Sequence, residues 1–202
     1  MISQINSDIG KEALGYVINS SLSKVSQDVV SQIQNQLKEN FSDLFWFPPT
    51  EALHVTLLDL IAPLVSYLQG KDFIFEENKR KYVTLFEGLT KDQTSIRINF
   101  DQILVSSSAI YITGTDDGSY QNIRSAFIDK VELEPGTKMP PSIIHVSIAR
   151  FIKEVDLENI KEFVSELNIN FNEIVTEFRL VKETKIPMLD YSVLQKFSLK
   201  QS

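Results

Sequence analysis

The chain has 202 residues, enough for one sizeable domain or a two-lobed one. Hydrophobic residues make up 43% of the chain and charged residues 23%, which is the mixture of a globular protein rather than a disordered one. The lack of cysteine excludes disulfides, thiolate metal sites and a cysteine nucleophile. The net charge of −7 argues against a partner that is a long nucleic acid polymer, because binders of such polymers usually present a basic face.

No segment reaches the roughly 18 consecutive apolar residues of a membrane span, and the first residues lack the basic-then-apolar pattern of a signal peptide. The missing cysteines fit a reducing compartment. We therefore expect a soluble, cytoplasmic protein with no membrane partner. A small phosphorylated ligand remains compatible with the acidic charge balance.

Hydrophobic spacing in the first half of the chain predicts short strands alternating with helices. The expected elements are a strand over 15–19, a helix over about 22–40 capped by Ser21 or Ser23, a strand over 53–60, a helix over about 76–92 and a strand over 95–104. Trp46-Phe47-Pro48-Pro49 breaks the chain before the second strand.

The second half continues the same alternation. The expected elements are a strand over 109–113, a turn over 116–118, a helix over about 119–131, a strand over 143–151, a helix over about 156–167, a strand over 171–181 and a last strand over 191–199. Pro140-Pro141 breaks the chain before the strand over 143–151. No linker is long enough to separate independent domains, so residues 1–202 are interpreted as one bilobal domain.

The two halves repeat one pattern. Each half has a strand, a helix, a Pro-Pro pair and then an apolar strand that carries a histidine, in HVTLLDL from residue 54 and HVSIARF from residue 145. The histidine follows the second proline by five residues in one half and by four in the other. This repeat predicts two pseudo-equivalent lobes, each a small sheet with helices on its outer face, with a cleft between them.

The only two histidines of the chain, His54 and His145, fall in matching tetrapeptides. Each is followed two residues later by a hydroxyl, at Thr56 and Ser147. Because residues i and i+2 of a strand point to the same side, each strand presents one imidazole and one hydroxyl on a shared face.

This set of groups suits phosphodiester cleavage without a metal. A neutral imidazole removes a proton from the attacking oxygen, and a protonated one supplies a proton to the leaving oxygen, because histidine titrates near neutral pH. The two hydroxyls can donate hydrogen bonds to the phosphate oxygens, where charge accumulates in the transition state. We therefore interpret His54, His145, Thr56 and Ser147 as the catalytic residues.

Two other interpretations stay open. A lone histidine in a strand is more often packed or exposed than catalytic, although two matching motifs weaken that explanation. Metal ligation would need a third ligand such as Asp59, because zinc catalysis usually uses three protein ligands. Strand alternation places Asp59 on the face opposite His54, so we expect no metal and no cofactor.

On these paired motifs the sequence resembles the two-histidine (2H) phosphoesterase superfamily, the group of 2′-5′ RNA ligase-like proteins and cyclic phosphodiesterases. That group is marked by two His-x-Thr/Ser-x motifs on equivalent strands of two lobes, which HVTL at 54–57 and HVSI at 145–148 match. The resemblance extends from about residue 14 to residue 199. It implies an α+β, bilobal fold with antiparallel sheets lining a central cleft.

The resemblance also implies a hydrolase acting on 2′,3′-cyclic phosphates or 2′-5′ phosphodiester bonds of RNA ends or small nucleotides. Ligation of RNA uses the same groups in reverse, and a non-catalytic nucleotide-binding module would keep the same cleft. We expect the protein to act as a monomer on a small nucleotide or an RNA end.

Substrate contacts are predicted from residues near the motifs. Arg150 is a candidate for phosphate binding, because similar proteins carry an arginine there. Strand alternation places it opposite His145, so it needs a bulge or a strand end to reach the cleft. The aromatic candidates for stacking on a base are Trp46, Phe47, Tyr111 and Tyr191.

Overall fold

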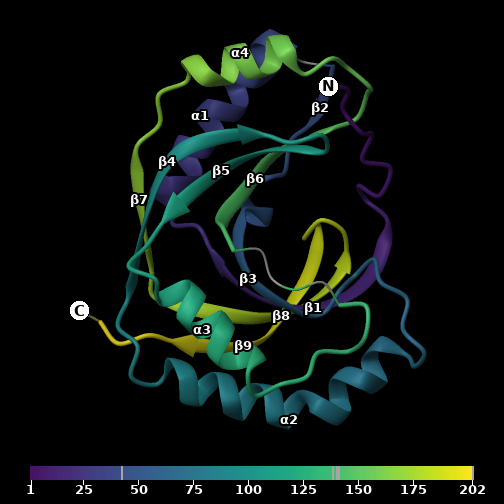
Figure 1. Cartoon of the computed structure of the whole chain (residues 1–202), viewed down its shortest axis with the longest axis vertical. Helices are drawn as coiled ribbons and strands as arrows, with labels where there is room; N and C mark the ends of the chain where they lie inside the picture. The colour runs from purple at the N-terminus through teal and green to yellow at the C-terminus, as the bar shows by residue number, and fades with distance from the viewer. Residues whose placement is uncertain (42, 138, 140–141, 202) are drawn as a thin grey trace.

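Two antiparallel sheets form the centre of the computed structural model, which describes residues 1–41, 43–137, 139 and 142–201 (Figure 1). The four-stranded sheet has the order β3-β1-β8-β9, from β1 (Glu12–Ser21), β3 (His54–Ile61), β8 (Glu177–Lys185) and β9 (Asp190–Ser198). The five-stranded sheet has the order β2-β6-β5-β4-β7, from β2 (Phe45–Trp46), β4 (Ile96–Val105), β5 (Ala109–Thr115), β6 (Ile144–Phe151) and β7 (Phe171–Val175). The predicted α+β fold with two lobes is confirmed.

Four helices cover the outer faces of the two sheets in the described part of the chain. They are α1 (Lys24–Phe41), α2 (Lys71–Thr90), α3 (Ser119–Ile128) and α4 (Glu158–Glu166). Figure 1 shows α1 and α4 beside the five-stranded sheet, and α2 and α3 beside the four-stranded one. Ser23 begins α1 as predicted, because its Oγ accepts a hydrogen bond from the Ser26 N–H at 3.3 Å.

The lobes are not the two sequence halves. Helix α1 follows β1 in the chain yet packs against β6 and β7 of the other sheet, and α3 follows β5 yet packs against β3. Strands β8 and β9 also return from the end of the chain to complete the sheet of β1 and β3. The repeat therefore describes the two sheets, whereas two of the helices are exchanged between them.

Three other expectations need correction. The single strand expected over 171–181 is two strands in different sheets, because the chain passes from β7 to β8 at Thr176. The break at Trp46 contains the short strand β2, which pairs with the end of β6. Helix α2 begins at Lys71, earlier than its apolar spacing indicated. The expected break at Pro140-Pro141 lies outside the described residues.

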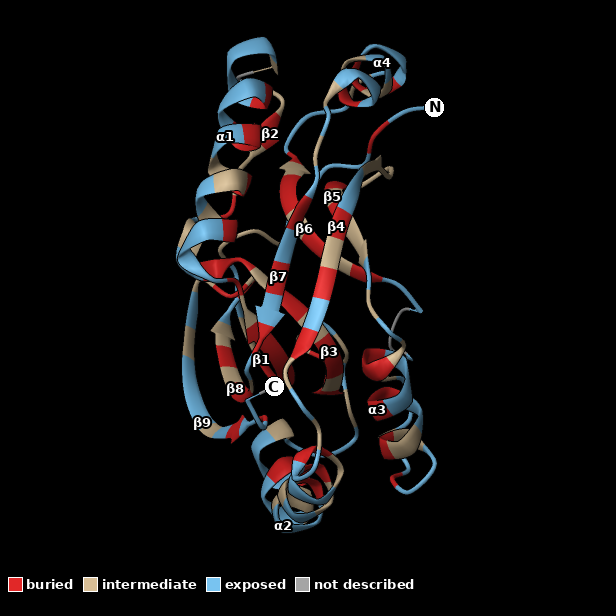
Figure 2. Cartoon of the chain, turned by 90° about the vertical axis from the view of Figure 1, so that its left-hand side faces the viewer, coloured by how far each residue is buried: buried red, intermediate tan, exposed pale blue. Residues whose placement is uncertain are grey.

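The core lies between the helices and the outer faces of the sheets. Figure 2 shows buried residues on the inward sides of α2 and α3 and exposed residues on their outer sides. Strand residues Val55, Leu57, Val146 and Ile148 are fully buried in this core. The alternate residues of β3 and β6, including both histidines, point to the other side, between the sheets.

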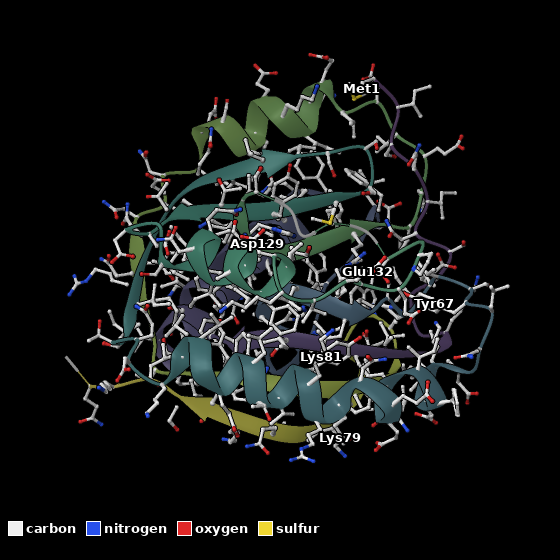
Figure 3. The ribbon with its side chains drawn as sticks, turned by 60° about the horizontal axis from the view of Figure 1, so that its bottom comes forward. Met1, Tyr67, Lys79, Lys81, Asp129 and Glu132 are labelled. Carbon is white, nitrogen blue, oxygen red and sulfur yellow. The ribbon has the colours of Figure 1, made fainter. Side chains whose placement is uncertain are left out.

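The densest basic run of the chain, Lys79-Arg80-Lys81, lies on α2. Lys79 and Lys81 lie on this helix at the outside of the lobe that contains the four-stranded sheet (Figure 3). Lys79 lies 3.5 Å from the Glu76 carboxylate, so part of this charge is neutralised locally. This run is on the side of the four-stranded sheet that faces away from the histidines.

Candidate active site

A β-bulge in β6 brings Arg150 to the same face as His145. Tyr111 of β5 pairs with Ser147, and the next residue, Ile110, pairs with Ala149. Ile148 is therefore an extra residue in β6, and both Ile148 and Ala149 are buried in the core. Because a bulge shifts the alternation by one residue, Arg150 returns to the side of His145 and Ser147.

The same bulge occurs at the equivalent place in β3. Asn19 of β1 pairs with Thr56, and Ile18 pairs with Leu58, so Leu57 is the extra residue. Asp59 consequently lies on the same face as His54, and the expectation that it points to the opposite face is wrong. Asp59 and Arg150 each follow their histidine by five residues and occupy equivalent positions in the two sheets.

Side chains from the exchanged helices bind the carbonyl groups at both bulges. Gln34 of α1 donates from Nε2 to the Ile148 carbonyl at 3.0 Å. Arg124 of α3 donates from Nε to the Leu57 carbonyl at 2.7 Å and from Nη2 to the Thr56 carbonyl at 2.8 Å. A buried carbonyl without a partner is costly, so these two side chains stabilise the irregular backbone next to each motif.

Arg124 also joins the two motifs. Its Nη1 donates to the Ile143 carbonyl, just before β6, at 3.3 Å, while the rest of the guanidinium binds β3. The side chain is 1% exposed and lies 5.5 Å above the Tyr120 ring. One rigid group thus fixes the relative position of the two histidine strands.

Both histidines and both hydroxyls line one small cavity between the sheets. This histidine cavity has a volume of about 100 Å³ and is lined by Pro48, Ala52, His54, Thr56, His145, Ser147, Arg150 and Pro187. That volume is well below the about 300–1,000 Å³ of pockets that hold drug-sized ligands. The histidine cavity is therefore suited to a single small group such as a phosphate.

The two imidazole rings are held in the same way. His54 Nδ1 lies 2.7 Å from the Ala52 carbonyl, two residues before it, so Nδ1 carries the proton that this bond needs. His145 is hydrogen-bonded to the backbone of Ile143, again two residues before it. Because Nδ1 of His54 is used by the backbone, Nε2 is the nitrogen left to exchange a proton.

Burial holds the pKa of both histidines below the ordinary value. It lowers the pKa of His54 to about 4, and the positive charges of Arg179 and Arg150 act in the same direction. Burial also lowers the pKa of His145, with Arg124 and Arg150 adding to the effect. Both rings are therefore neutral at pH 7, and an anion between them would favour their protonation.

The guanidinium of Arg150 lies at the centre of the site. Its Nη1 donates to Asn6 Oδ1 at 3.4 Å, whereas its Nε is buried and has no hydrogen-bond partner among the described residues. A buried donor of a charged group is costly to leave unpaired. Because Arg150 also lines the histidine cavity, its guanidinium is placed to bind an anion there.

The aromatic side chains that were predicted to stack on a base lie at different distances from the histidines. Tyr111 stands beside Ser147, and its ring meets the His145 ring edge-on at 5.5 Å between centroids. Trp46 pairs with Arg150 across β2 and β6. Phe47 packs against the main core, with its ring 5.9 Å from that of Phe45, so it does not line the histidine cavity.

Tyr191 packs at the edge of the cleft rather than in the histidine cavity. Its ring lies 5.6 Å from the Arg179 guanidinium, and its hydroxyl donates to the Glu51 carbonyl at 3.3 Å. It also contacts a small apolar cluster of Val17, Ala52, Val181 and Met188. Within this structure Tyr191 supports the wall of the cleft.

Sequence reasoning missed four polar residues that surround the site: Asn6, Arg124, Arg179 and Glu183. Arg179 donates from Nε and Nη2 to Asn19 Oδ1 at 3.2 and 3.0 Å. In the four-stranded sheet, Asn19 pairs with Arg179 on one side and with Thr56 on the other. None of the four lies in a recognisable motif. The one available signal was a charged residue inside an apolar segment, as Arg179 is in FRLV.

In the described part of the chain, no three His, Asp or Glu side chains come together in a way that could hold a metal ion. Asp59 shares a face with His54, but these two residues do not form part of such a group. No helix in the described ranges is long and apolar enough to span a membrane.

No protein-family model and no curated protein sequence matches this chain. Solved structures do match over nearly its whole length. The protein TT0787 of Thermus thermophilus is 17% identical with a TM-score of 0.65, covering 93% of this chain and 99% of that one. A structure described as a phosphoesterase is 18% identical with a TM-score of 0.62, covering 93% and 99%.

LigT of E. coli complexed with 3′-AMP is 18% identical with a TM-score of 0.63, covering 94% of this chain and 100% of that one. The chain has the fold of these three proteins. This is the bilobal fold that the resemblance to the two-histidine phosphoesterases implied, and that prediction is confirmed.

Proposed function

We propose that this protein is a metal-independent phosphodiesterase of the two-histidine superfamily, acting on 2′,3′-cyclic phosphate or 2′-5′ phosphodiester bonds of small nucleotides or RNA ends. One observation carries the proposal. Two His-x-Thr/Ser motifs from different sheets line a single small cavity, together with an arginine whose buried Nε has no partner among the described residues. This set of groups is complementary to a phosphate anion.

For a 2′,3′-cyclic phosphate, one imidazole accepts a proton from water as the water oxygen attacks phosphorus. The bond from phosphorus to one ribose oxygen breaks, and the second imidazole gives its proton to that oxygen. The product is a nucleoside 2′- or 3′-monophosphate, in which the other of these two ribose oxygens has become a free hydroxyl. The proton on the second imidazole is taken up with the anionic substrate, because both rings are neutral in the free protein.

The charge that accumulates on the non-bridging oxygens has three donors. Thr56 and Ser147 supply hydroxyls, and Arg150 supplies its guanidinium from the same cavity. Such donors stabilise the transition state because they are held in place before the reaction begins. The guanidinium can bind two oxygens at once, which also fixes the orientation of the phosphate.

The scale of the site favours small substrates. LigT of E. coli was crystallised with ATP, 3′-AMP and NADP⁺, which are small nucleotides. The likeness in fold and the paired motifs support a nucleotide as substrate here as well. The acidic net charge of −7 is consistent with short substrates rather than long polymers.

A substrate panel tests this proposal. The purified protein is incubated with 2′,3′-cyclic nucleotides, 2′-5′ linked oligoadenylates and cyclic dinucleotides, with and without EDTA, and the products are identified by chromatography. We expect hydrolysis of a member of the first two groups that EDTA does not reduce. Activity that EDTA abolishes, or nucleotide binding without any turnover, would contradict the proposal.

A further inference from the structure

The two equivalent bulges present opposite charges to the cleft. The bulge in β6 brings Arg150 to the cleft face, and the bulge in β3 brings Asp59 there. At these corresponding positions, the five-stranded sheet therefore presents a cation and the four-stranded sheet presents a carboxyl group. A substrate with one phosphate and one group rich in hydrogen-bond donors would match both of these groups.

A second cavity lies beside Asp59. This side cavity has a volume of about 190 Å³ and shares His54, Thr56, Arg150 and Pro187 with the histidine cavity. Together the two cavities approach the size of a pocket for a small nucleotide. A ligand whose phosphate occupies the histidine cavity would therefore extend into the side cavity.

The side cavity combines apolar walls with carboxyl groups. Its apolar lining consists of Ile9, Val17, Pro63, Leu64, Ile186, Pro187 and Met188. Its carboxyl groups belong to Asp8, Asp59 and Glu183. A nucleobase has the matching character, because its two faces are apolar while its edge is polar.

Glu183 is the most deeply buried of these carboxyls, at 4% exposure. The Met188 N–H donates to its Oε1, which holds the side chain against the wall of the cavity. Burial raises its pKa to about 7, and the nearby Asp59 adds to the effect. Asp8, by contrast, is only half-buried and pairs with Lys11 at 2.7 Å.

We propose that the side cavity is a base subsite selective for guanine, in which Glu183 and Asp59 accept hydrogen bonds from the base edge. This inference rests on the proposed phosphodiesterase function and names its substrate class as guanosine 2′,3′-cyclic phosphate or an RNA end with guanine at that place. Carboxylates accept hydrogen bonds and do not donate them when ionised. Guanine is the common base whose edge carries neighbouring N–H donors, at N1 and N2.

Other occupants fit less well. A second phosphate would face three carboxyls, and Arg150 is already shared with the first phosphate. A quaternary ammonium group is usually held by the faces of Trp, Tyr or Phe, and none of these three is among the described residues that line this cavity. The positive charge of Arg150, which lines the side cavity, would also repel a cation there.

The test compares 2′,3′-cyclic GMP with 2′,3′-cyclic IMP, which lacks only the amino group (N2) on C2 of the base. At about pH 8, above the pKa of Glu183 of about 7, we expect kcat/KM to be about tenfold higher for the guanine nucleotide, because loss of this amino group leaves a charged acceptor unpaired. In Glu183→Gln this ratio should fall towards one. The glutamine keeps an oxygen for the Met188 N–H, so folding should persist, which thermal unfolding checks.

Glu177→Gln is the matched control, because Glu177 lies on the same strand and pairs with Lys196 at 2.8 Å, outside the cavity. This variant should keep the wild-type ratio. A wild-type ratio near one, or a ratio that Glu183→Gln leaves unchanged, would overturn the base subsite. The base subsite would also be overturned if the protein hydrolysed 4-nitrophenyl phosphocholine faster than 2′,3′-cyclic GMP. That result would assign the cavity to a cation.

Measurements of nucleotide binding test the base subsite independently of the proposed phosphodiesterase activity. The dissociation constants of 3′-GMP and 3′-IMP, measured by calorimetry, should differ by a similar factor whether or not the protein turns over a substrate. Equal constants would reject the subsite while leaving the phosphodiesterase proposal intact. A difference without any hydrolysis would uphold the subsite and reject the phosphodiesterase.

Discussion

His54 and His145 share one local arrangement, in which each ring is hydrogen-bonded to the backbone two residues earlier in the chain. This bond orients the ring and leaves the other nitrogen for proton exchange. Burial then keeps both rings neutral in the free protein. The substrate itself, as an anion, supplies the field that allows one of them to become charged.

These shifts determine the pH dependence of activity. The base must be neutral and the acid protonated, and the pKa of His54 is about 4 while that of His145 is also below its usual value. The value of kcat/KM reports the free enzyme. It should rise through the lower pKa, fall through the higher one and reach its maximum below about pH 6.5, the ordinary histidine pKa.

A pH–rate profile on the best substrate of the panel measures this maximum. The same profile for Glu183→Gln separates the histidines from the buried carboxyl, whose pKa is about 7. The maximum of kcat/KM for Glu183→Gln should stay below about pH 6.5. A wild-type maximum of kcat/KM above about pH 7 would show that burial does not control these rings.

Arg150 should be needed for the chemical step. Arg150→Met removes a charged donor from the histidine cavity, and losses of such donors typically lower kcat by about 10²-fold or more. Arg150→Lys keeps the charge but loses the planar fork, so it should recover only part of the activity. Steady-state kinetics of both variants, with the exposed Arg97→Met as control, measure the difference. Equal activity of Arg150→Met and wild type would exclude the assigned role.

At the level of the elements, the bulges of β3 and β6 mark how far sequence reasoning can go. The strands and their histidines followed from apolar alternation, because one face of each strand packs in the core. The bulges did not, since Leu57 and Ile148 are apolar residues like their neighbours and carry no mark of an extra residue. The correct face of Asp59 and the route of Arg150 to the cleft therefore required the structure.

The same limit applied to the long-range partners of the bulges. Gln34 and Arg124 come from helices that are exchanged between the sheets, and nothing local predicts that exchange. The strand expected over 171–181 failed for a similar reason. Its alternation runs through Thr176, where the chain leaves one sheet for the other.

Arg124 links the elements of the site, and its substitution should have two separate effects. Arg124→Met removes three hydrogen bonds to carbonyls of both histidine strands, and it should lower the free energy of unfolding by about 2 kcal/mol or more. It also removes a charge that lowers the pKa of His145, so the limb of the pH–rate profile that His145 controls should move to higher pH.

Arg124→Lys distinguishes these effects, because it keeps the charge and loses the fork. It should lose stability, measured by urea unfolding, but keep the position of the limb that His145 controls. If Arg124→Met lowered stability without moving that limb, Arg124 would be a structural residue without an electrostatic effect on the site.

At the scale of the whole molecule, the first eleven residues connect the two lobes. The Asn6 N–H donates to the Phe151 carbonyl beside the five-stranded sheet at 2.8 Å, and the Gly10 N–H donates to the Ile186 carbonyl beside the four-stranded sheet at 2.7 Å. Asn6 and Ile9 also line the side cavity. This segment therefore both joins the lobes and closes one wall of the site.

Removal of residues 2–8 should lower the thermal midpoint of unfolding and reduce kcat/KM, because the truncation opens the side cavity and removes Asn6 from Arg150. Asn6→Ala keeps the backbone bonds and loses only the side chain, so it should affect activity more than stability. Thermal unfolding and steady-state kinetics of both proteins measure this. A truncated protein with wild-type kinetics would show that the segment is only a structural link.

The most direct test of the whole account compares His54→Ala, His145→Ala and the double variant on the substrate that the panel identifies. Groups that act as one acid–base unit lose their effect together, so each single variant should lower kcat by about 10³-fold or more and the double variant by little beyond that. A single variant that keeps full activity, or two losses that multiply as independent effects, would contradict the pairing of His54 and His145.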